Sequence, residues 1–146
     1  MPGGAALPEV LLVAPHFPSP EHARDGQGVY VLEVARALVA QGIRVRALVL
    51  RFGGDRAQEQ VEGIQIQRVD PPQPIESVFG LYSGGNLGPA METLARAAKA
   101  ETGSQGFVAW CHGYECGAVA QTLAALGVPV VGVLPCSSVE RRGWKE

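Results

Sequence analysis

The stretch EVLLVA at residues 9–14 is a short, continuous apolar run. It predicts a strand buried on both faces, because it is too short for a core helix and leaves no polar face. Residues 28–41 follow with apolar side chains at helical spacing, and Gly42 is a natural stop for that helix. IRVRALVL at residues 43–50 then predicts a second strand. This strand–helix–strand unit indicates a parallel sheet covered by helices.

The rest of the chain repeats the same alternation. Further strands are predicted at 63–69, 107–111 and 128–134, and further helices at 86–101 and 114–126. Segment 51–62 is polar and turn-like, and segments 15–27 and 70–85 are long loops rich in Pro and Gly. We therefore expect one Rossmann-like, doubly wound α/β domain over residues 1–146. Its sheet should have five strands in the order 3-2-1-4-5.

Composition excludes several classes of protein. The 146 residues (15.3 kDa) are 47% hydrophobic, which is enough for a packed core and excludes a disordered chain. Lys and Arg number 12 against 14 acidic residues, so no nucleic-acid footprint is expected. Three Cys and an N-terminus without a basic signal region favour a reducing, cytoplasmic setting. No apolar run approaches the roughly 18 residues of a membrane span, while composition leaves peripheral membrane contact open.

The first candidate for ligand binding is the segment Asp25, Gly26, Gln27 and Gly28, which leads directly into a helix. Glycines let the backbone approach a ligand closely, and a helix N-terminus offers unpaired N–H groups to a phosphate. The segment does not fit a dinucleotide fingerprint, because the third glycine is absent. The alternative is a simple glycine turn in which Asp25 caps the helix.

The second candidate is His112, directly after the strand predicted at 107–111. Ligands of open α/β sheets bind beyond the carboxyl ends of the strands, where this imidazole would reach them. The alternative is a half-buried histidine that caps the next helix. Cys111, His112 and Cys116 also suggest zinc, but a fourth ligand is missing and Cys111 is expected in the core, so no metal is predicted. His16 and His22 are expected to be solvated loop residues.

The third candidate follows the last strand, where Ser137 and Ser138 precede Arg141. Hydroxyl and guanidinium groups there could bind an anionic or hydroxylated ligand. The alternative is a solvated helix start with serine as its cap.

In this order and spacing, the segments resemble the N-terminal domain of the family 4 glycosyltransferases, which have the GT-B fold. Five segments carry the resemblance. The first two are a glycine-containing loop with its helix (residues 25–38) and the entry to the second strand (residues 41–45). The others are a strand ending in His (residues 107–114), a G-V-P-V-V strand (residues 127–131) and an S-S-V-E-R stretch (residues 137–141). Departures are Ile43 and Gly113, where the family has His and Asp, and Pro135-Cys136, where a His usually ends the strand.

The resemblance implies a retaining transfer of a sugar from a nucleotide-sugar, with no further cofactor. This chain would be the acceptor-side half, inactive alone, and its partner would be a C-terminal donor-binding domain. Residues 25–28 would approach the donor diphosphate and His112 the transferred sugar. The part of the site that binds a carbohydrate or other hydroxylated acceptor would be lined by Gly113, Tyr114, Ser137, Ser138 and Arg141. A stand-alone binding or regulatory module is the alternative, whereas a flavodoxin-like protein is disfavoured by the long first loop.

Overall fold

A computed structural model of the chain describes residues 9–19, 26–103 and 106–133. Within these residues the sheet has six strands in the order β3-β4-β2-β1-β5-β6, and every neighbouring pair is parallel except β3 and β4. The strands are β1 (Glu9–Val13), β2 (Val45–Leu50), β3 (Gln58–Val61), β4 (Ile64–Val69), β5 (Phe107–His112) and β6 (Val130–Val133). The helices are α1 (Gly26–Ala40), α2 (Val78–Leu81), α3 (Leu87–Ala100) and α4 (Gly117–Ala125), with single 3-10 turns η1 (Glu101–Gly103) and η2 (Tyr114–Cys116).

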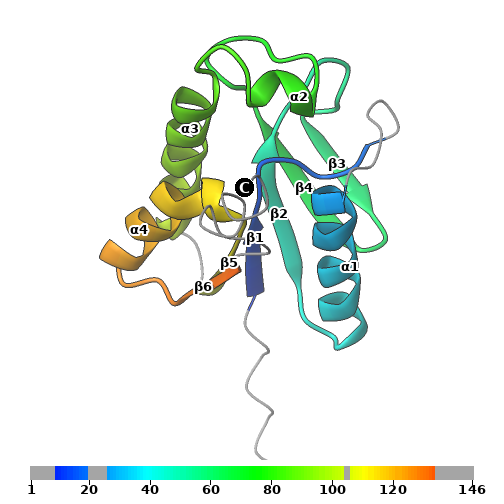
Figure 1. Cartoon of the computed structure of the whole chain (residues 1–146). Coiled ribbons are helices and arrows are strands. Elements are labelled where there is room, and N and C mark those ends of the chain that lie inside the picture. The colour runs from blue at the N-terminus through cyan, green and yellow to red at the C-terminus, as the bar shows by residue number, and fades with distance from the viewer. Residues whose placement is uncertain (1–8, 20–25, 104–105, 134–146) are drawn as a thin grey trace, which may run out of the picture.

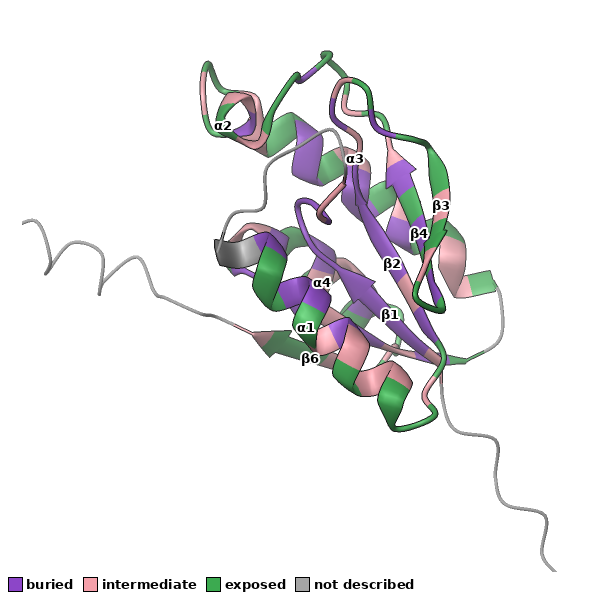
Figure 2. Ribbon diagram, turned by 90° about the vertical axis from the view of Figure 1, so that its right-hand side faces the viewer, coloured by how far each residue is buried: buried purple, intermediate pink, exposed green. Residues whose placement is uncertain are grey.

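The helices cover the two faces of the sheet in separate layers. Helix α1 lies on one face, and α3 and α4 lie side by side on the other (Figure 1). Alternate residues of each central strand enter alternate cores, so that Leu11 packs toward α3 and α4 while Leu12 packs toward α1. Strands β1 and β2 are buried along most of their length, whereas the edge strands are more exposed (Figure 2).

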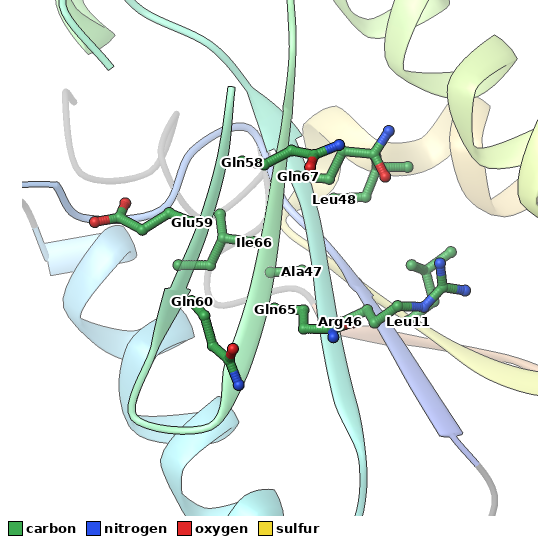
Figure 3. A pocket seen from close by; sticks show the side chains of 10 residues that line it. All are labelled: Leu11, Arg46, Ala47, Leu48, Gln58, Glu59, Gln60, Gln65, Ile66 and Gln67. Atoms are coloured by element: carbon green, nitrogen blue, oxygen red, sulfur yellow. The ribbon is translucent and has the colours of Figure 1, made fainter. Parts of the chain in front are cut away.

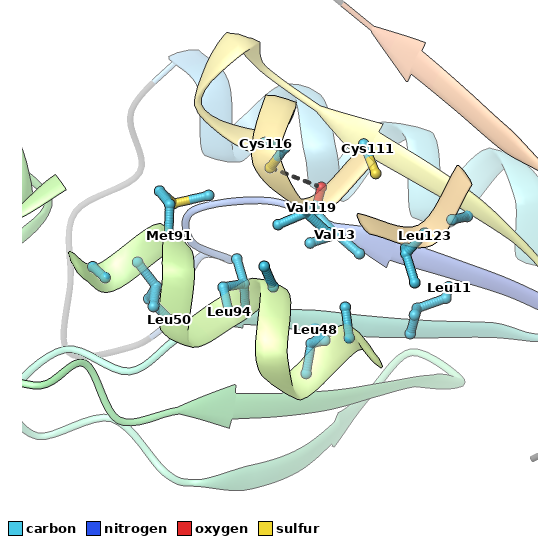
Figure 4. Packing of buried hydrophobic residues seen from close by; sticks show 14 of the residues in the cluster. Leu11, Val13, Leu48, Leu50, Met91, Leu94, Cys111, Cys116, Val119 and Leu123 are labelled. Carbon is cyan, nitrogen blue, oxygen red and sulfur yellow. Dashed lines mark hydrogen bonds between the residues drawn. The ribbon is translucent and has the colours of Figure 1, made fainter. Parts of the chain in front are cut away.

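The core under α3 and α4 is aliphatic and closely packed. Leu94 of α3 and Leu123 of α4 are fully buried against Leu11 and Leu48 of the sheet (Figure 4). Apolar burial of this kind contributes about 1.5–3 kcal/mol for each such side chain. This core holds the strand ends in a fixed arrangement, and the ends position the candidate site.

The predicted fold class is confirmed, and five strands stand in the predicted order. The prediction of a turn-like segment over 51–62 is wrong for Gln58–Val61, which form the antiparallel edge strand β3. Glu62 (φ 51°) and Gly63 (φ 81°) make the two-residue reversal between β3 and β4. Positive φ at both positions is typical of a tight hairpin turn, which favours glycine. Strand β3 gave no sequence signal because its side chains are mostly polar and alternate between exposed and partly buried.

The segment predicted as a long loop over 70–85 contains the short helix α2. The Ser77 side chain accepts a hydrogen bond from the Gly80 N–H at 3.4 Å, and Leu81 is fully buried in the core below. The Asn86 side chain donates to the Gly80 carbonyl at 3.0 Å, which closes the segment against the start of α3. Much of this segment is therefore ordered by local hydrogen bonds and one apolar anchor.

A buried arginine joins the ends of β2, β3 and β4. The Arg68 side chain has no exposed surface; its Nη1 donates to Glu59 at 2.8 Å and its Nε lies 3.9 Å from the Asp55 carboxylate. Asp55 also accepts a hydrogen bond from the Ser19 hydroxyl at 2.5 Å. This cluster ties the loop after β1 to the strand ends on its side of the sheet.

Candidate functional site

The candidate site lies where β5 ends beside the beginning of α1. His112 is the last residue of β5, and its ring centroid is 4.9 Å from that of Tyr30, with the planes tilted by 34°. Tyr30 lies four residues after the first residue of α1, which is about 6 Å along the helix axis. Because β1 and β5 are adjacent and parallel, the N-terminus of α1 and the end of β5 share the carboxyl edge of the sheet.

His112 is buried without a polar partner among the described residues. Its side chain has no exposed surface, and neither ring nitrogen forms a hydrogen bond within that part of the chain. Burial lowers the pKa of His112 below its ordinary value, and the negative charge of Glu115 offsets part of this effect. The imidazole is therefore neutral at pH 7 and has one donor and one acceptor nitrogen. Unsatisfied buried polar atoms are rare in folded proteins, and each calls for an explanation such as a bound group or a water molecule.

Gly113 shapes the exit from β5. Its φ of 93° and ψ of 152° are accessible to glycine but not to other residues without strain. Its N–H donates to the Val133 carbonyl at 2.8 Å, and its carbonyl accepts from the Cys116 N–H at 3.1 Å. These bonds bring the chain from His112 directly into η2, which exposes Tyr114 beside the candidate site.

A contact that sequence reasoning missed connects the segment around α2 to this edge. The Tyr82 hydroxyl donates to Glu115 Oε1 at 2.8 Å. The two residues lie 33 positions apart, and no local pattern in the sequence pairs them. The hydrogen bond places the α2 segment at the rim that also carries His112 and Tyr114.

The two described cysteines are core residues. Burial raises the pKa of Cys111 to about 11 and raises that of Cys116 well above its ordinary range. The Cys116 thiol donates to the Val13 carbonyl at 3.6 Å (Figure 4). Protonated thiols are poor metal ligands, and no group of three His, Cys, Asp or Glu in the described residues could hold a metal ion. His16, expected to be solvated, is buried and lies 6.1 Å from the Phe52 ring; His22 is outside the described residues.

The predicted site residues divide into those that the structure brings together and those outside the described part. Gly26, Gln27 and Gly28 form the first turn of α1, and His112, Gly113 and Tyr114 lie at the end of β5. The helix begins two residues earlier than predicted, so Gly26 is helical rather than part of the preceding loop. The predictions for Asp25, Ser137, Ser138 and Arg141 fall outside the described residues.

Two hollows lined by described residues lie away from His112. One, of about 450 Å³, is on the α3 side of the sheet, where Gln58, Gln60, Gln65 and Gln67 project from β3 and β4 (Figure 3). A second, of about 310 Å³, lies at the ends of β2 and β4 and includes Arg51. His112 shares the α1 side of β5 with Trp110, so it faces away from the glutamine-lined hollow. Glutamine amides bind ligands but supply no acid, base or nucleophile for transfer chemistry.

Comparison with known proteins identifies the family. Residues 25–145 match the family described as "Glycosyl transferase 4-like domain". The chain belongs to this glycosyltransferase family. The match spans the first turn of α1, His112 and the segment after β6, which are the segments on which the sequence resemblance depends. No curated protein sequence matches the chain closely enough to support a relationship.

Solved structures share the fold of this glycosyl transferase 4-like domain. Os79 from O. sativa in complex with UDP has a TM-score of 0.59 and 14% identity, over 84% of this chain and 28% of that one. The trehalose-phosphate synthase of Burkholderia xenovorans, in complex with glucose-6-phosphate, has a TM-score of 0.51 and 14% identity, over 86% and 34%. The C-terminal domain of a hydrogenase from Pyrococcus furiosus has a TM-score of 0.52 and 15% identity, over 92% and 96%.

These structural matches, at such low identity, establish the fold alone, and the hydrogenase domain shows that this fold carries other functions. The domain spans about a third or less of the length of Os79 and of the trehalose-phosphate synthase. No helix within the described ranges is both long and apolar enough to cross a membrane.

Proposed function

We propose that this domain is the acceptor-side half of a glycosyltransferase that transfers a sugar from a nucleotide-sugar to a hydroxylated acceptor. The observation that carries the proposal is the neutral His112 at the carboxyl edge, which has no hydrogen-bond partner among the described residues and lies against Tyr30, about one turn from the beginning of α1. The family match supports the transferase chemistry. A donor-binding domain would complete the site, and the reaction would take place in the cytoplasm without a metal ion.

The first turn of α1 is suited to the phosphate end of the donor. A helix N-terminus is the positive end of the helix dipole, which favours a negatively charged group. Gly26 and Gly28 place no side chain on that turn, so a diphosphate could approach the backbone closely. This supports a contact between residues 26–28 and the phosphates of a nucleotide-sugar.

His112 is suited to hydrogen bonding rather than proton abstraction. A neutral imidazole can donate to a sugar hydroxyl or to the charge that develops as the sugar leaves. Burial excludes water and strengthens such a bond. Because Tyr30 lies against the imidazole, the sugar would reach His112 only after the Tyr30 ring swings aside. Gly113 and Tyr114 would then border the acceptor.

The test uses the polypeptide encoded by the complete gene, assayed against UDP-, GDP- and ADP-sugars with hydroxylated acceptors. We expect sugar transfer with at least one donor, and His112→Ala should lower turnover about 10²- to 10³-fold with an unchanged circular dichroism spectrum. Leu126→Ala, on an exposed position at the end of α4, is the matched control and should leave turnover unchanged. Absence of transfer with every donor, or full activity of His112→Ala, would contradict the proposal.

The second candidate is a binding or regulatory module without catalysis, because the hydrogenase domain shows that the same fold also occurs outside glycosyltransferases. The 146-residue chain discriminates between the two. A glycosyltransferase half should transfer no sugar alone but gain activity when a donor-binding domain is supplied. A regulatory module should remain inactive with any such domain.

A further inference from the structure

Exposed aromatic side chains gather at the carboxyl edge of the sheet. Of the seven large hydrophobic residues exposed in the described part of the chain, five lie at this edge and two lie elsewhere. Four of the five are aromatic and form what we call the aromatic strip: Tyr30, Phe79, Tyr82 and Tyr114. Phe79 is the extreme case, with 84% of its surface exposed. An exposed aromatic cluster is costly in water and marks a binding surface.

Contacts connect the members of the strip across the edge. Tyr30 of α1 lies against His112, and Tyr114 is only two residues further along the chain from that histidine. The next residue, Glu115, accepts the hydrogen bond from Tyr82. Tyr82 is joined in turn to Phe79 by a backbone hydrogen bond of 3.2 Å. The strip therefore runs from α1 over the end of β5 to α2, with His112 near its middle.

The segments that carry the strip have no positive charge. Residues 26–35, 71–95 and 107–133 contain neither Lys nor Arg. The carboxylate of Glu115, beside Tyr114, accepts a hydrogen bond from the Tyr82 hydroxyl. A phosphorylated or carboxylated acceptor would find no cation on these segments to pair with. A neutral ligand with a flat apolar face would instead pack against the aromatic rings and bury apolar surface of both the ligand and the protein.

We propose that the aromatic strip is the acceptor surface of this domain and that it selects neutral acceptors in which the reacting hydroxyl is next to an apolar ring. The inference rests on the proposed function, whose acceptor it specifies. The strip would hold the ring, and the hydroxyl would point toward His112. An amphipathic acceptor fits a surface in which tyrosine hydroxyls alternate with apolar ring faces.

The test measures binding to the 146-residue chain by NMR titration with three probes. 4-Nitrophenyl β-D-glucopyranoside carries a neutral sugar and an aromatic ring, methyl β-D-glucopyranoside carries the sugar alone, and glucose 6-phosphate adds an anion. We expect the nitrophenyl glucoside to bind at least about tenfold more tightly than the other two. Binding of the nitrophenyl glucoside should shift the NMR resonances of Phe79 and Tyr114.

Paired variants locate the binding. Phe79→Ala should weaken the affinity for the nitrophenyl glucoside about 2- to 12-fold, as expected for loss of one aromatic contact. Leu126→Ala removes a 47%-exposed apolar side chain outside the strip and should change nothing. Both positions are on the surface, so neither variant should unfold the protein.

Equal affinity for the three probes would overturn the inference, as would an effect of Leu126→Ala as large as that of Phe79→Ala. Tighter binding of glucose 6-phosphate would assign the edge to an anionic acceptor instead and would likewise overturn it. These outcomes do not depend on sugar transfer. A failure of the proposed function appears separately, as inactivity of the complete polypeptide toward every nucleotide-sugar.

Discussion

The ring of Tyr30 lies against the imidazole of His112, with the ring centroids 4.9 Å apart and the planes tilted by 34°. Tyr30 is half exposed while His112 is fully buried, so the tyrosine shields the histidine from solvent. The contact joins the first helix to the end of the fifth strand at the carboxyl edge. Tyr30 therefore has two roles: its ring covers His112, and it is a member of the aromatic strip.

Removing this cover should raise the pKa of His112. Tyr30→Ala admits water to the imidazole, and renewed hydration favours its charged form, so the pKa should move up toward the ordinary value of about 6.5. Loss of the aromatic contact should also cost about 0.5–1.5 kcal/mol of stability. NMR titration of the histidine ring protons measures the pKa. Tyr114→Ala is the control, and an equal rise in that variant would contradict a specific shielding role for Tyr30.

The stability of the domain should fall on mild acidification because of His112. Its folded-state pKa lies below the unfolded value, so the unfolded state binds the proton more readily. Above about pH 7 His112 is uncharged in both states and does not lower the free energy of unfolding. Stability is lost as the pH falls from the ordinary histidine pKa toward the folded-state pKa, and the full loss is about 1.4 kcal/mol for each unit by which these two pKa values differ. Urea unfolding at pH 7.5 and pH 5 measures it. His112→Asn should show a smaller loss than the native chain, and identical losses would refute the prediction.

Arg68 should be essential for stability although it lies far from His112. Its side chain is fully buried between Glu59 and Asp55, so Arg68→Ala leaves two carboxylates in the interior without their cation. Breaking a buried ion pair in this way costs about 3–5 kcal/mol. Chemical denaturation measures the loss. Arg96→Ala, which removes an exposed arginine from α3, should leave stability nearly unchanged.

A triple variant shows whether the cost comes from the stranded carboxylates. Arg68→Met combined with Glu59→Gln and Asp55→Asn should regain part of the stability lost in Arg68→Ala, since no buried charge remains. A triple variant less stable than Arg68→Ala would show that packing of the arginine stem dominates instead.

The two core thiols should be unreactive while the domain is folded. Burial raises the pKa of both Cys111 and Cys116, so little thiolate forms at pH 8. In a Cys136→Ser background, Ellman's reagent should label almost nothing in native buffer and two thiols in 6 M guanidinium. Rapid labelling of either thiol without denaturant would contradict their place in the core.

The sequence by itself was sufficient for the main elements and for the position of His112. Apolar runs such as residues 9–14 specify buried strands through local composition, and helical spacing specifies α1 and α3. Once the strands are parallel, a residue that directly follows a strand must lie at the carboxyl edge. Thus His112 and the first turn of α1 could be assigned to one edge from the chain order alone.

Only the tertiary structure decided which side chains meet there. Strand β3 is polar and pairs as an edge strand through its backbone, so no apolar periodicity reveals it. The partners of Arg68, the Tyr82–Glu115 hydrogen bond and the Tyr30–His112 contact join residues far apart along the chain. Local patterns report which face of an element is apolar. The neighbours of a given side chain depend on how whole elements pack, because close packing leaves each buried group only the partners that its neighbouring strands and helices bring within reach.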